Sequence, residues 1–240
     1  MTALLQADSL YRFYHAGDDE TLALQGVSFA VQAGELVAVT GPSGSGKSTL
    51  LGCLAGLDEP TAGMVQVDGQ RLSRRPEAER AAIRATTIGM LFQSANLVEH
   101  LTVAENVELA QRIAGRPDRA RAAKVLADVG LQARTHARPS QLSGGELARA
   151  GLAVALANDP RVVLADEPTG ELDGVTAHGV LNLLRARAQD GAAVVVVTHN
   201  PAVADVADRT IALADGRIAD PAARAAPSAP DARPHAEVTP

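Results

Sequence analysis

A glycine-rich segment between positions 41 and 49 has the residue types of a phosphate-binding loop. It follows an apolar run at 35–40 and consists of Gly41, Pro42, Ser43, Gly44, Ser45, Gly46, Lys47, Ser48 and Thr49. Glycines let consecutive backbone N–H groups point at phosphate oxygens, and a following helix N-terminus adds partial positive charge. Lys47 can reach the outer phosphates of ATP, and the Ser48 hydroxyl can ligate Mg²⁺. The segment is therefore a P-loop, and we predict that these nine residues bind ATP.

The lysine of this loop is unusual for the composition of the chain. The sequence carries 22 basic residues, yet only Lys47 and Lys124 are lysines. The arginine guanidinium is planar and broad, whereas a crowded phosphate-binding loop accommodates the compact ammonium group of lysine better. Because the composition favours arginine so strongly, a lysine at this position indicates a chemical demand and argues against a merely flexible Gly/Ser loop.

Two carboxylates, Asp166 and Glu167, come directly after a second apolar run at 161–165. Asp166 can hold Mg²⁺ through water, and Glu167 can accept a proton from an attacking water molecule. In isolation, such a pair is more often the solvated end of a strand. Together with the P-loop, it predicts the metal-holding and catalytic carboxylates of an ATPase.

The decisive motif reads Leu142-Ser143-Gly144-Gly145-Glu146 and lies about twenty residues before Asp166. It resembles the signature sequence that separates the ATP-binding cassette (ABC) family from other P-loop proteins. Three further segments, 92–97, 101–107 and 166–173, resemble the branch of this family that contains the lipoprotein-release, macrolide-export and cell-division ATPases.

The resemblance extends over nearly the whole chain, from about Leu10 to Arg217. Tyr14 resembles the aromatic residue on which adenine stacks, and Gln93 resembles the Q-loop glutamine. Asp173 resembles the D-loop aspartate at the dimer interface, and His199 resembles the switch histidine. A single tyrosine or histidine is more often structural, but their order around a P-loop supports the resemblance.

The resemblance implies a dimer in which two copies of the chain face each other head to tail. Each ATP would lie between the P-loop of one copy and the signature of the other, which would contact it through Ser143, Gly144, Gly145 and Glu146. Glu167 would activate water, and His199 would contact the γ-phosphate. Mg²⁺ would be held by Ser48, Gln93 and Asp166. Gln93 would pass the change to a membrane subunit through a groove formed with residues around 94–106.

Two positions depart from the family pattern. Glu146 stands where glutamine is usual, and Val154 stands in a helix that commonly carries arginine. The spacing from Ser143 to Glu146 is that of a helix capping box, a role that glutamate fills as well as glutamine. The alternative is that an added carboxylate near a γ-phosphate slows turnover. We favour the capping role, because a helix N-terminus stabilises a carboxylate.

The elements that position these residues alternate between strands and helices. We expect an α/β fold: a P-loop NTPase (RecA-like) core with a mostly parallel sheet, an N-terminal antiparallel β-subdomain and an α-helical signature subdomain at about 95–158. Apolar runs predict the strands, at 35–40, 64–68, 87–92, 161–165, 192–198 and 210–213. Caps and periodicity predict the helices, at 48–55, 76–84, 102–114, 118–129 and 173–189.

Bulk properties bound the remaining expectations. We expect one domain at 1–219 and a disordered Ala/Pro-rich tail at 220–240. A formal charge of −6 disfavours nucleic acid as a partner. The single cysteine, Cys53, forms no internal disulfide. Without a visible signal peptide or a long apolar run, the chain is expected in the cytoplasm, peripheral on the inner face of the cell membrane.

Three functional classes fit these residues. The leading one is the energising subunit of a transporter, which pairs with separate transmembrane permease subunits and with a second copy of itself. In the second, the same ATPase cycle moves a membrane protein that transports nothing. In the third, a soluble ABC protein acts on ribosomes or DNA, which the single cassette and the acidic balance disfavour.

Overall fold

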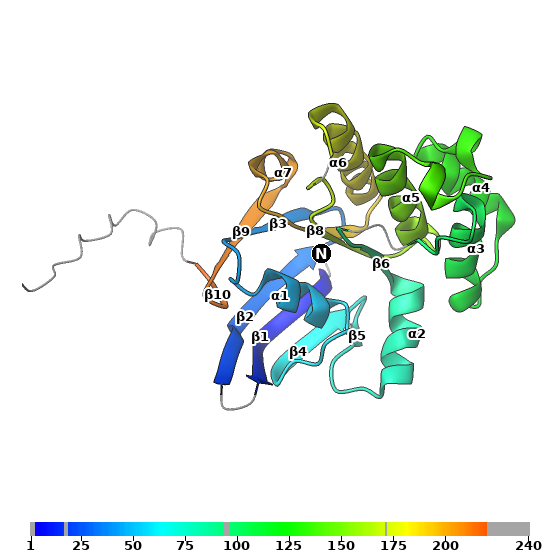
Figure 1. Ribbon diagram of the computed structural model, residues 1–240. Helices are drawn as coiled ribbons and strands as arrows, with labels where there is room; N and C mark the ends of the chain where they lie inside the picture. Colours follow the sequence, from blue (N-terminus) through cyan, green and yellow to red (C-terminus); the bar gives the residue numbers. More distant parts are fainter. Residues whose placement is uncertain (1–2, 17–18, 94–96, 171, 220–240) are drawn as a thin grey trace, which may run out of the picture.

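The computed structural model describes residues 3–16, 19–93, 97–170 and 172–219. It contains two sheets with helices packed around them (Figure 1). The predicted tail at 220–240 lies outside the described residues. Within the described ranges, no helix is long and apolar enough to cross a bilayer.

The larger sheet has six strands in the order β10-β9-β3-β8-β7-β6. Their bounds are Arg217–Ile218, Arg209–Ala214, Leu36–Thr40, Ala193–Val197, Val162–Asp166 and Ile88–Leu91. All neighbours are parallel except β10 and β9. The central strand β8 is buried throughout, as its run of valines predicts for a parallel strand covered on both faces. The mostly parallel sheet is thus confirmed.

The smaller sheet is antiparallel and has the order β2-β1-β4-β5. Its strands span Asp19–Gln32, Ala3–Ala16, Ala62–Val67 and Gln70–Arg71. Helix α1 (Lys47–Leu54) contacts strands of both sheets, and one continuous core includes Leu10, Leu24, Leu50 and Val195. The predicted N-terminal antiparallel sheet is therefore present, and it holds the P-loop helix against the parallel sheet.

The other face of the parallel sheet is covered by helices (Figure 1). Helices α6 (Gly174–Gln189), α5 (Gly144–Leu156), α3 (Val103–Ile113) and α4 (Arg119–Asp128) share a second core. The capping box predicted at Thr102 and Glu105 is present at the start of α3. Helices α3 to α5 lie inside the segment that we assigned to the helical subdomain.

Several predicted boundaries were wrong. Helix α2 (Glu77–Thr87) continues past Arg84, so Thr87 ends a helix and does not begin a strand. Its buried Thr87 and Ile83 lie on one face, which keeps the amphipathic pattern going. The short helix α7 (Pro201–Val206) was not predicted at all. It is only six residues long, which is too short to show helical periodicity.

Candidate functional site

The P-loop connects the end of β3 to the start of α1, as predicted. Close packing explains why two positions of the loop require glycine. A Cβ at Gly41 would lie 2.1 Å from the carbonyl oxygen of Leu213, and one at Gly46 would lie 2.4 Å from that of Ala23. Gly46 also has φ 99°, a conformation that favours glycine. The loop therefore runs against the backbone of β9 and β2.

A cavity of about 730 Å³ opens beside this loop. Its walls bring together predicted site residues from distant parts of the chain: Tyr14, Gly41, Pro42, Ser43, Gly44, Gly46, Lys47, Ser48, Thr49, Gln93, Asp166, Glu167 and His199. Ser45 is the exception in the P-loop. It is buried behind the loop, where its carbonyl oxygen accepts a hydrogen bond from the N–H of Gly216 at 3.1 Å.

The Lys47 ammonium is directed along its own loop. Its Nζ donates to the carbonyl oxygens of Gly41 at 2.8 Å and Pro42 at 2.9 Å. Both acceptors belong to the loop that forms the cavity wall. The positive charge is thus held beside the glycine-rich backbone, where phosphate oxygens can be met by the ammonium and by N–H groups together.

The two carboxylates after β7 have different surroundings. The pKa of Asp166 is raised by burial and by the neighbouring Glu167, with Lys47 acting in the opposite direction. Glu167 has φ 44°, and its backbone N–H donates to the carbonyl oxygen of Val197 at 2.8 Å. The chain therefore bends sharply after the strand, which turns Glu167 toward β8 and the segment that follows it.

Three hydrogen bonds fix the Glu167 carboxylate. Thr198 Oγ1 donates to Oε2 at 2.9 Å, and the backbone N–H of His199 donates to Oε1 at 3.0 Å. His199 Nδ1 lies 2.7 Å from the same Oε1. Thr198 is completely buried, whereas the His199 side chain is largely exposed. A carboxylate held from one side by a buried hydroxyl is well placed to accept a proton from the cavity side.

The signature residues lie at the N-terminus of α5. Ser143 Oγ accepts from the N–H of Glu146 at 3.3 Å, and Glu146 Oε2 accepts from the N–H of Ser143 at 2.9 Å. The predicted capping box is thus confirmed. Arg134 Nε donates to the other oxygen of Glu146 at 2.8 Å. The Ser143 N–H and Arg134 hold the pKa of Glu146 below its usual range.

A shallow hollow surrounds this helix end. It is lined by Arg134, Ser143, Gly144, Gly145, Glu146, Arg149, Leu172, Asp173 and Thr176. Asp173 caps α6, since its Oδ1 accepts from the N–H of Val175 at 3.0 Å and of Thr176 at 3.1 Å. Within the described part of the chain, this signature hollow and the P-loop cavity share no lining residue. The structure therefore divides the predicted site residues into two separate surfaces.

Some residues of these surfaces were missed from the sequence. Ala23, Gln25, Asp215 and Gly216 line the P-loop cavity because β2 and the β9–β10 turn pack against the loop. Arg134 reaches Glu146 from a 3₁₀ turn twelve residues away. Nothing in a single sequence signals such pairings, since they depend on how separate segments pack.

This arrangement of a parallel sheet, a P-loop and two carboxylates at the end of a neighbouring strand defines a P-loop nucleotide-binding protein. Residues 24–170, more than half of the chain, match the ABC transporter family. An uncharacterised ABC transporter ATP-binding protein of Thermotoga maritima is 47% identical over 221 residues, which cover 91% of this chain and 94% of that protein. The chain belongs to the ABC transporter family and is an ATP-binding cassette.

Other relatives are longer. The macrolide export ATP-binding/permease protein MacB of Hyphomonas neptunium is 43% identical over 218 residues, or 90% of this chain. The chain spans only 34% of that protein. Among solved structures, the dimeric cassette MJ0796 bound to ADP and Pi superposes with a TM-score of 0.83 at 38% identity, covering 89% of this chain and 96% of that one. The MacB match thus supports the expected branch of the family, and the superposition confirms the cassette fold.

Proposed function

We propose that the chain binds and hydrolyses Mg-ATP in the P-loop cavity and so drives separate membrane subunits. The observation that carries this proposal is the convergence of Tyr14, Gln93, Glu167 and His199 on the P-loop from four different segments. The loop backbone and Lys47 would hold the phosphates, and Tyr14 would stack on the adenine.

Ser48, Gln93 and Asp166 all line this cavity and offer a hydroxyl, an amide and a carboxylate oxygen. Oxygen donors of this kind suit Mg²⁺, which keeps several waters and phosphate oxygens as its other ligands. When bound, the metal neutralises charge that develops on the phosphates. Burial raises the pKa of Asp166 because it disfavours the charged carboxylate. A bound cation would favour the charged form again, which fits a role in holding Mg²⁺.

Within this site, Glu167 would accept the proton of the attacking water. Thr198 Oγ1 and the His199 backbone N–H hold its carboxylate toward one side, at 2.9 and 3.0 Å. His199 is largely exposed on the cavity wall, and its ring contacts Glu167 Oε1 through Nδ1 at 2.7 Å. To contact a γ-phosphate, the ring would present its other nitrogen or exchange this contact for the phosphate, while its backbone N–H keeps its place. Positioning of water and charge, more than covalent chemistry, is what phosphoryl transfer demands of a protein.

The signature hollow would complete the site of a second copy. It presents the backbone N–H groups of Gly144 and Gly145 at a helix N-terminus, which favours anions. The dimeric MJ0796 structure with ADP and Pi, 38% identical, supports such an assembly. Ser143, Gly144, Gly145 and Glu146 would then lie against the ATP held by the partner, with Asp173 at the same interface. Arg134 pairs with Glu146 and so offsets the carboxylate charge near that phosphate.

An apolar hollow of about 280 Å³ is our candidate for the contact with a membrane subunit. It lies between α2, β6, α3 and α5, and its lining includes Leu57, Phe92, Ile113 and Val154. Leu57 and Ile113 are exposed, at 47% and 70%. The groove predicted at 94–106 does not coincide with it: residues 97–106 do not line it, and 94–96 lie outside the described residues. Docking there would keep the chain peripheral on the inner face of the membrane.

The test is Mg-ATP hydrolysis by the full chain and by Glu167→Gln, with dimer formation followed by size-exclusion chromatography. We expect the wild type to turn over and the variant to bind ATP, stop hydrolysing and accumulate as a dimer. Turnover should fall about 100-fold or more, as for loss of a general base. Glu79→Gln, on the exposed side of α2, is the matched control and should behave as wild type. Unchanged turnover in Glu167→Gln would refute the assignment.

A further inference from the structure

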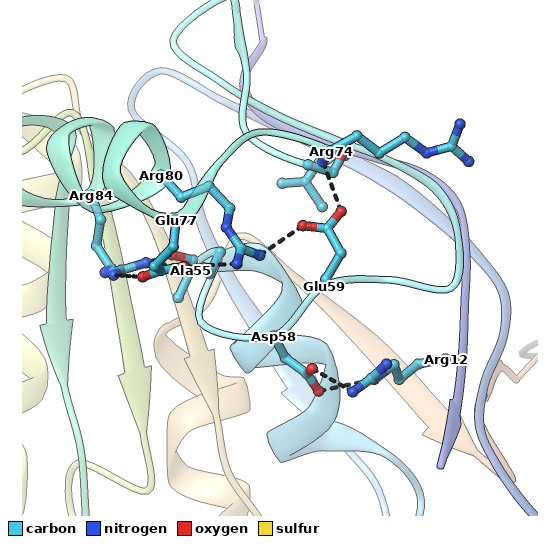
Figure 2. A network of polar contacts seen from close by, with 11 residues as sticks. Arg12, Ala55, Asp58, Glu59, Arg74, Glu77, Arg80 and Arg84 are labelled. Atoms are coloured by element: carbon cyan, nitrogen blue, oxygen red, sulfur yellow. Dashed lines mark hydrogen bonds and ion pairs between the residues drawn. The ribbon is translucent and has the colours of Figure 1, made fainter. Parts of the chain in front are cut away.

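Arg12 and Asp58 both contact the Tyr14 side chain, although neither of them lines the P-loop cavity. The guanidinium carbon of Arg12 lies 4.5 Å from the centre of the Tyr14 ring. Arg12 also donates from Nε to Asp58 Oδ2 at 3.1 Å, and its Nη2 lies 2.7 Å from Oδ1 (Figure 2). The Tyr14 hydroxyl donates to the same carboxylate. One carboxylate therefore holds both the cation and the phenol.

Strand geometry explains why the cation and the ring meet. Arg12 and Tyr14 are two residues apart on β1, so their side chains leave the strand on the same face. The side chains of Arg12 and Asp58 are 24% and 25% exposed, so this ion pair is mostly shielded from solvent. In that setting a cation over an aromatic face gains more than at an open surface.

Asp58 is held in place from the P-loop helix. The backbone N–H groups of Leu57 and Asp58 both donate to the carbonyl oxygen of Gly52 in α1, at 2.9 and 3.1 Å. Thr61, three residues further on, joins the same segment to β1, because its N–H donates to the Tyr11 carbonyl at 2.8 Å and its Oγ1 accepts from the Phe13 N–H at 3.2 Å.

Helix α2 fixes the same segment from the other side (Figure 2). Glu59 Oε2 accepts from Arg80 Nη1 at 2.6 Å, and Glu59 Oε1 accepts from the N–H of Arg74 at 2.7 Å. Arg84 donates to the carbonyl oxygen of Gly56 at 3.0 Å, just beyond the C-terminus of α1. The Asp58 carboxylate is thus carried on a segment tied to α1, β1 and α2, which makes it a rigid support for the ring.

We propose that Arg12 and Asp58 are positioning residues that set how strongly Tyr14 binds the purine base, an inference that rests on the nucleotide site proposed above. Arg12 covers one face of the ring and leaves the other for the base. Asp58 fixes the ring orientation through the hydroxyl. A ring that is already held in its stacking orientation loses little conformational entropy when the base binds. In addition, the cation draws the electron density of the ring toward the covered face.

A purely structural role predicts something different. The ion pair also joins β1 to the segment after α1, and its loss could loosen the P-loop as a whole. That effect would weaken all phosphate ligands alike. An effect through Tyr14 weakens only ligands with a base, so ATP and inorganic tripolyphosphate distinguish the two roles.

The experiment measures the dissociation constants of ATP and of inorganic tripolyphosphate for the full chain and for Arg12→Met. We expect ATP to bind about five- to tenfold more weakly, as for loss of a shielded cation–π contact, and tripolyphosphate to bind within about twofold of wild type. Arg12→Lys keeps a cation near the ring and should recover part of the ATP affinity. Arg75→Met is the matched control, since Arg75 pairs only with the exposed Glu79 on α2 among the carboxylates of the described residues.

A double-mutant cycle completes the test. In a Tyr14→Ala background, Arg12→Met should cause no further loss of ATP affinity, because the ring through which Arg12 acts is gone. Equal weakening of ATP and tripolyphosphate, or an additive loss in the Tyr14→Ala background, would overturn the inference. Failure of the wild-type chain to bind ATP would instead refute the nucleotide site itself, so the two failures are distinguishable. If Arg12→Met does not fold, the same ligand comparison on Arg12→Lys and Asp58→Asn decides.

Discussion

The P-loop cavity and the signature hollow carry the two halves of the predicted chemistry, but they are built differently. The cavity lies at the carboxyl ends of buried strands, and its groups are held by neighbours inside the same chain, such as Thr198 behind Glu167. The signature hollow lies at the exposed start of α5, where Gly144 has open space above it. The first surface brings the P-loop and both carboxylates together on one copy, whereas the second would act, under our proposal, on the nucleotide of a partner.

Because of this difference, substitutions on the two surfaces should act at different steps. Changes in the P-loop cavity should alter ATP binding or turnover at the site of the copy that carries them. Changes in the signature hollow should leave nucleotide binding by one copy intact and act only once two copies meet.

The largest effect is expected from Lys47→Arg in the P-loop. The ammonium fits between the carbonyl oxygens of Gly41 and Pro42, at 2.8 and 2.9 Å, whereas a planar guanidinium would not fit there. ATP affinity and turnover should both fall, turnover by about 100-fold or more. The only other lysine, Lys124, pairs with Asp128 on the exposed side of α4, so Lys124→Arg is the control and should change neither quantity. Near-normal turnover in Lys47→Arg would contradict the conclusion that this position requires a lysine.

Gly144→Ala tests the signature hollow. A Cβ at Gly144 meets nothing within 4 Å in its own chain, so folding and ATP binding by one copy should be unaffected. In a dimer, the added methyl group would lie against the partner's γ-phosphate, and turnover should fall about 10- to 100-fold. Binding is measured by fluorescence titration and dimerisation by light scattering. Turnover like that of the wild type would show that this surface does not contact the nucleotide.

Two other glycines serve as comparisons for this test. Gly179, exposed in the middle of α6, also has free space, and Gly179→Ala should raise the free energy of unfolding by about 0.5–1 kcal/mol without affecting turnover. At Gly145, by contrast, a Cβ would lie 2.4 Å from Thr176 Cγ2. Any loss in Gly145→Ala would therefore mix a clash within the chain with an effect on the dimer, which makes Gly144 the cleaner position.

The two surfaces also differ in how far the sequence could predict them. The P-loop, Asp166 and Glu167 could be placed because they follow short apolar runs that stop at a glycine or a carboxylate, as buried parallel strands do. The capping boxes at Thr102 and Ser143 could be placed because they depend on residues only three apart. Local patterns of this kind need no knowledge of the fold.

What the sequence could not supply are contacts between distant segments. Arg12 meets Asp58 across 46 positions, and Thr198 meets Glu167 across 31. These pairs depend on which strands become neighbours, a property of the whole sheet that no local pattern records. The same reasoning explains why the apolar hollow proposed above was not predicted, since its lining comes from α2, β6, α3 and α5 together.

Thr198→Val tests one such contact in the P-loop cavity. Valine keeps the shape and burial of threonine but removes the hydroxyl that donates to Glu167 Oε2 at 2.9 Å. Turnover should fall about tenfold, as for one hydrogen bond to a charged group, while ATP affinity changes little. Thr198→Ser keeps the hydroxyl and should recover most of the rate. A loss of ATP affinity equal to the loss of rate would show a general structural defect instead.

The smallest effect is expected from Glu146→Gln in the signature hollow. The capping contact survives this change, so ATP affinity should stay within a few-fold, and turnover should rise modestly at most. The pKa of Glu146 is lowered by the Ser143 N–H and by Arg134, so its charged form stabilises the folded state above its ordinary pKa of 4.5.

That stabilisation is lost as the pH falls through the lowered pKa of the folded protein. Wild type should therefore unfold at slightly higher urea concentration than Glu146→Gln near pH 7, and the difference should shrink as the pH falls below 4.5 and vanish once the pH is below the lowered pKa of the folded protein. Arg134→Gln removes the ion pair with Glu146 but leaves the hydrogen bond from the Ser143 N–H. The stability difference between wild type and Arg134→Gln should therefore depend on pH in the same direction, but it should be smaller than for Glu146→Gln. A large tightening of the ATP-bound dimer in Glu146→Gln would instead mean that the carboxylate opposes closure, and that the signature hollow limits turnover in this chain.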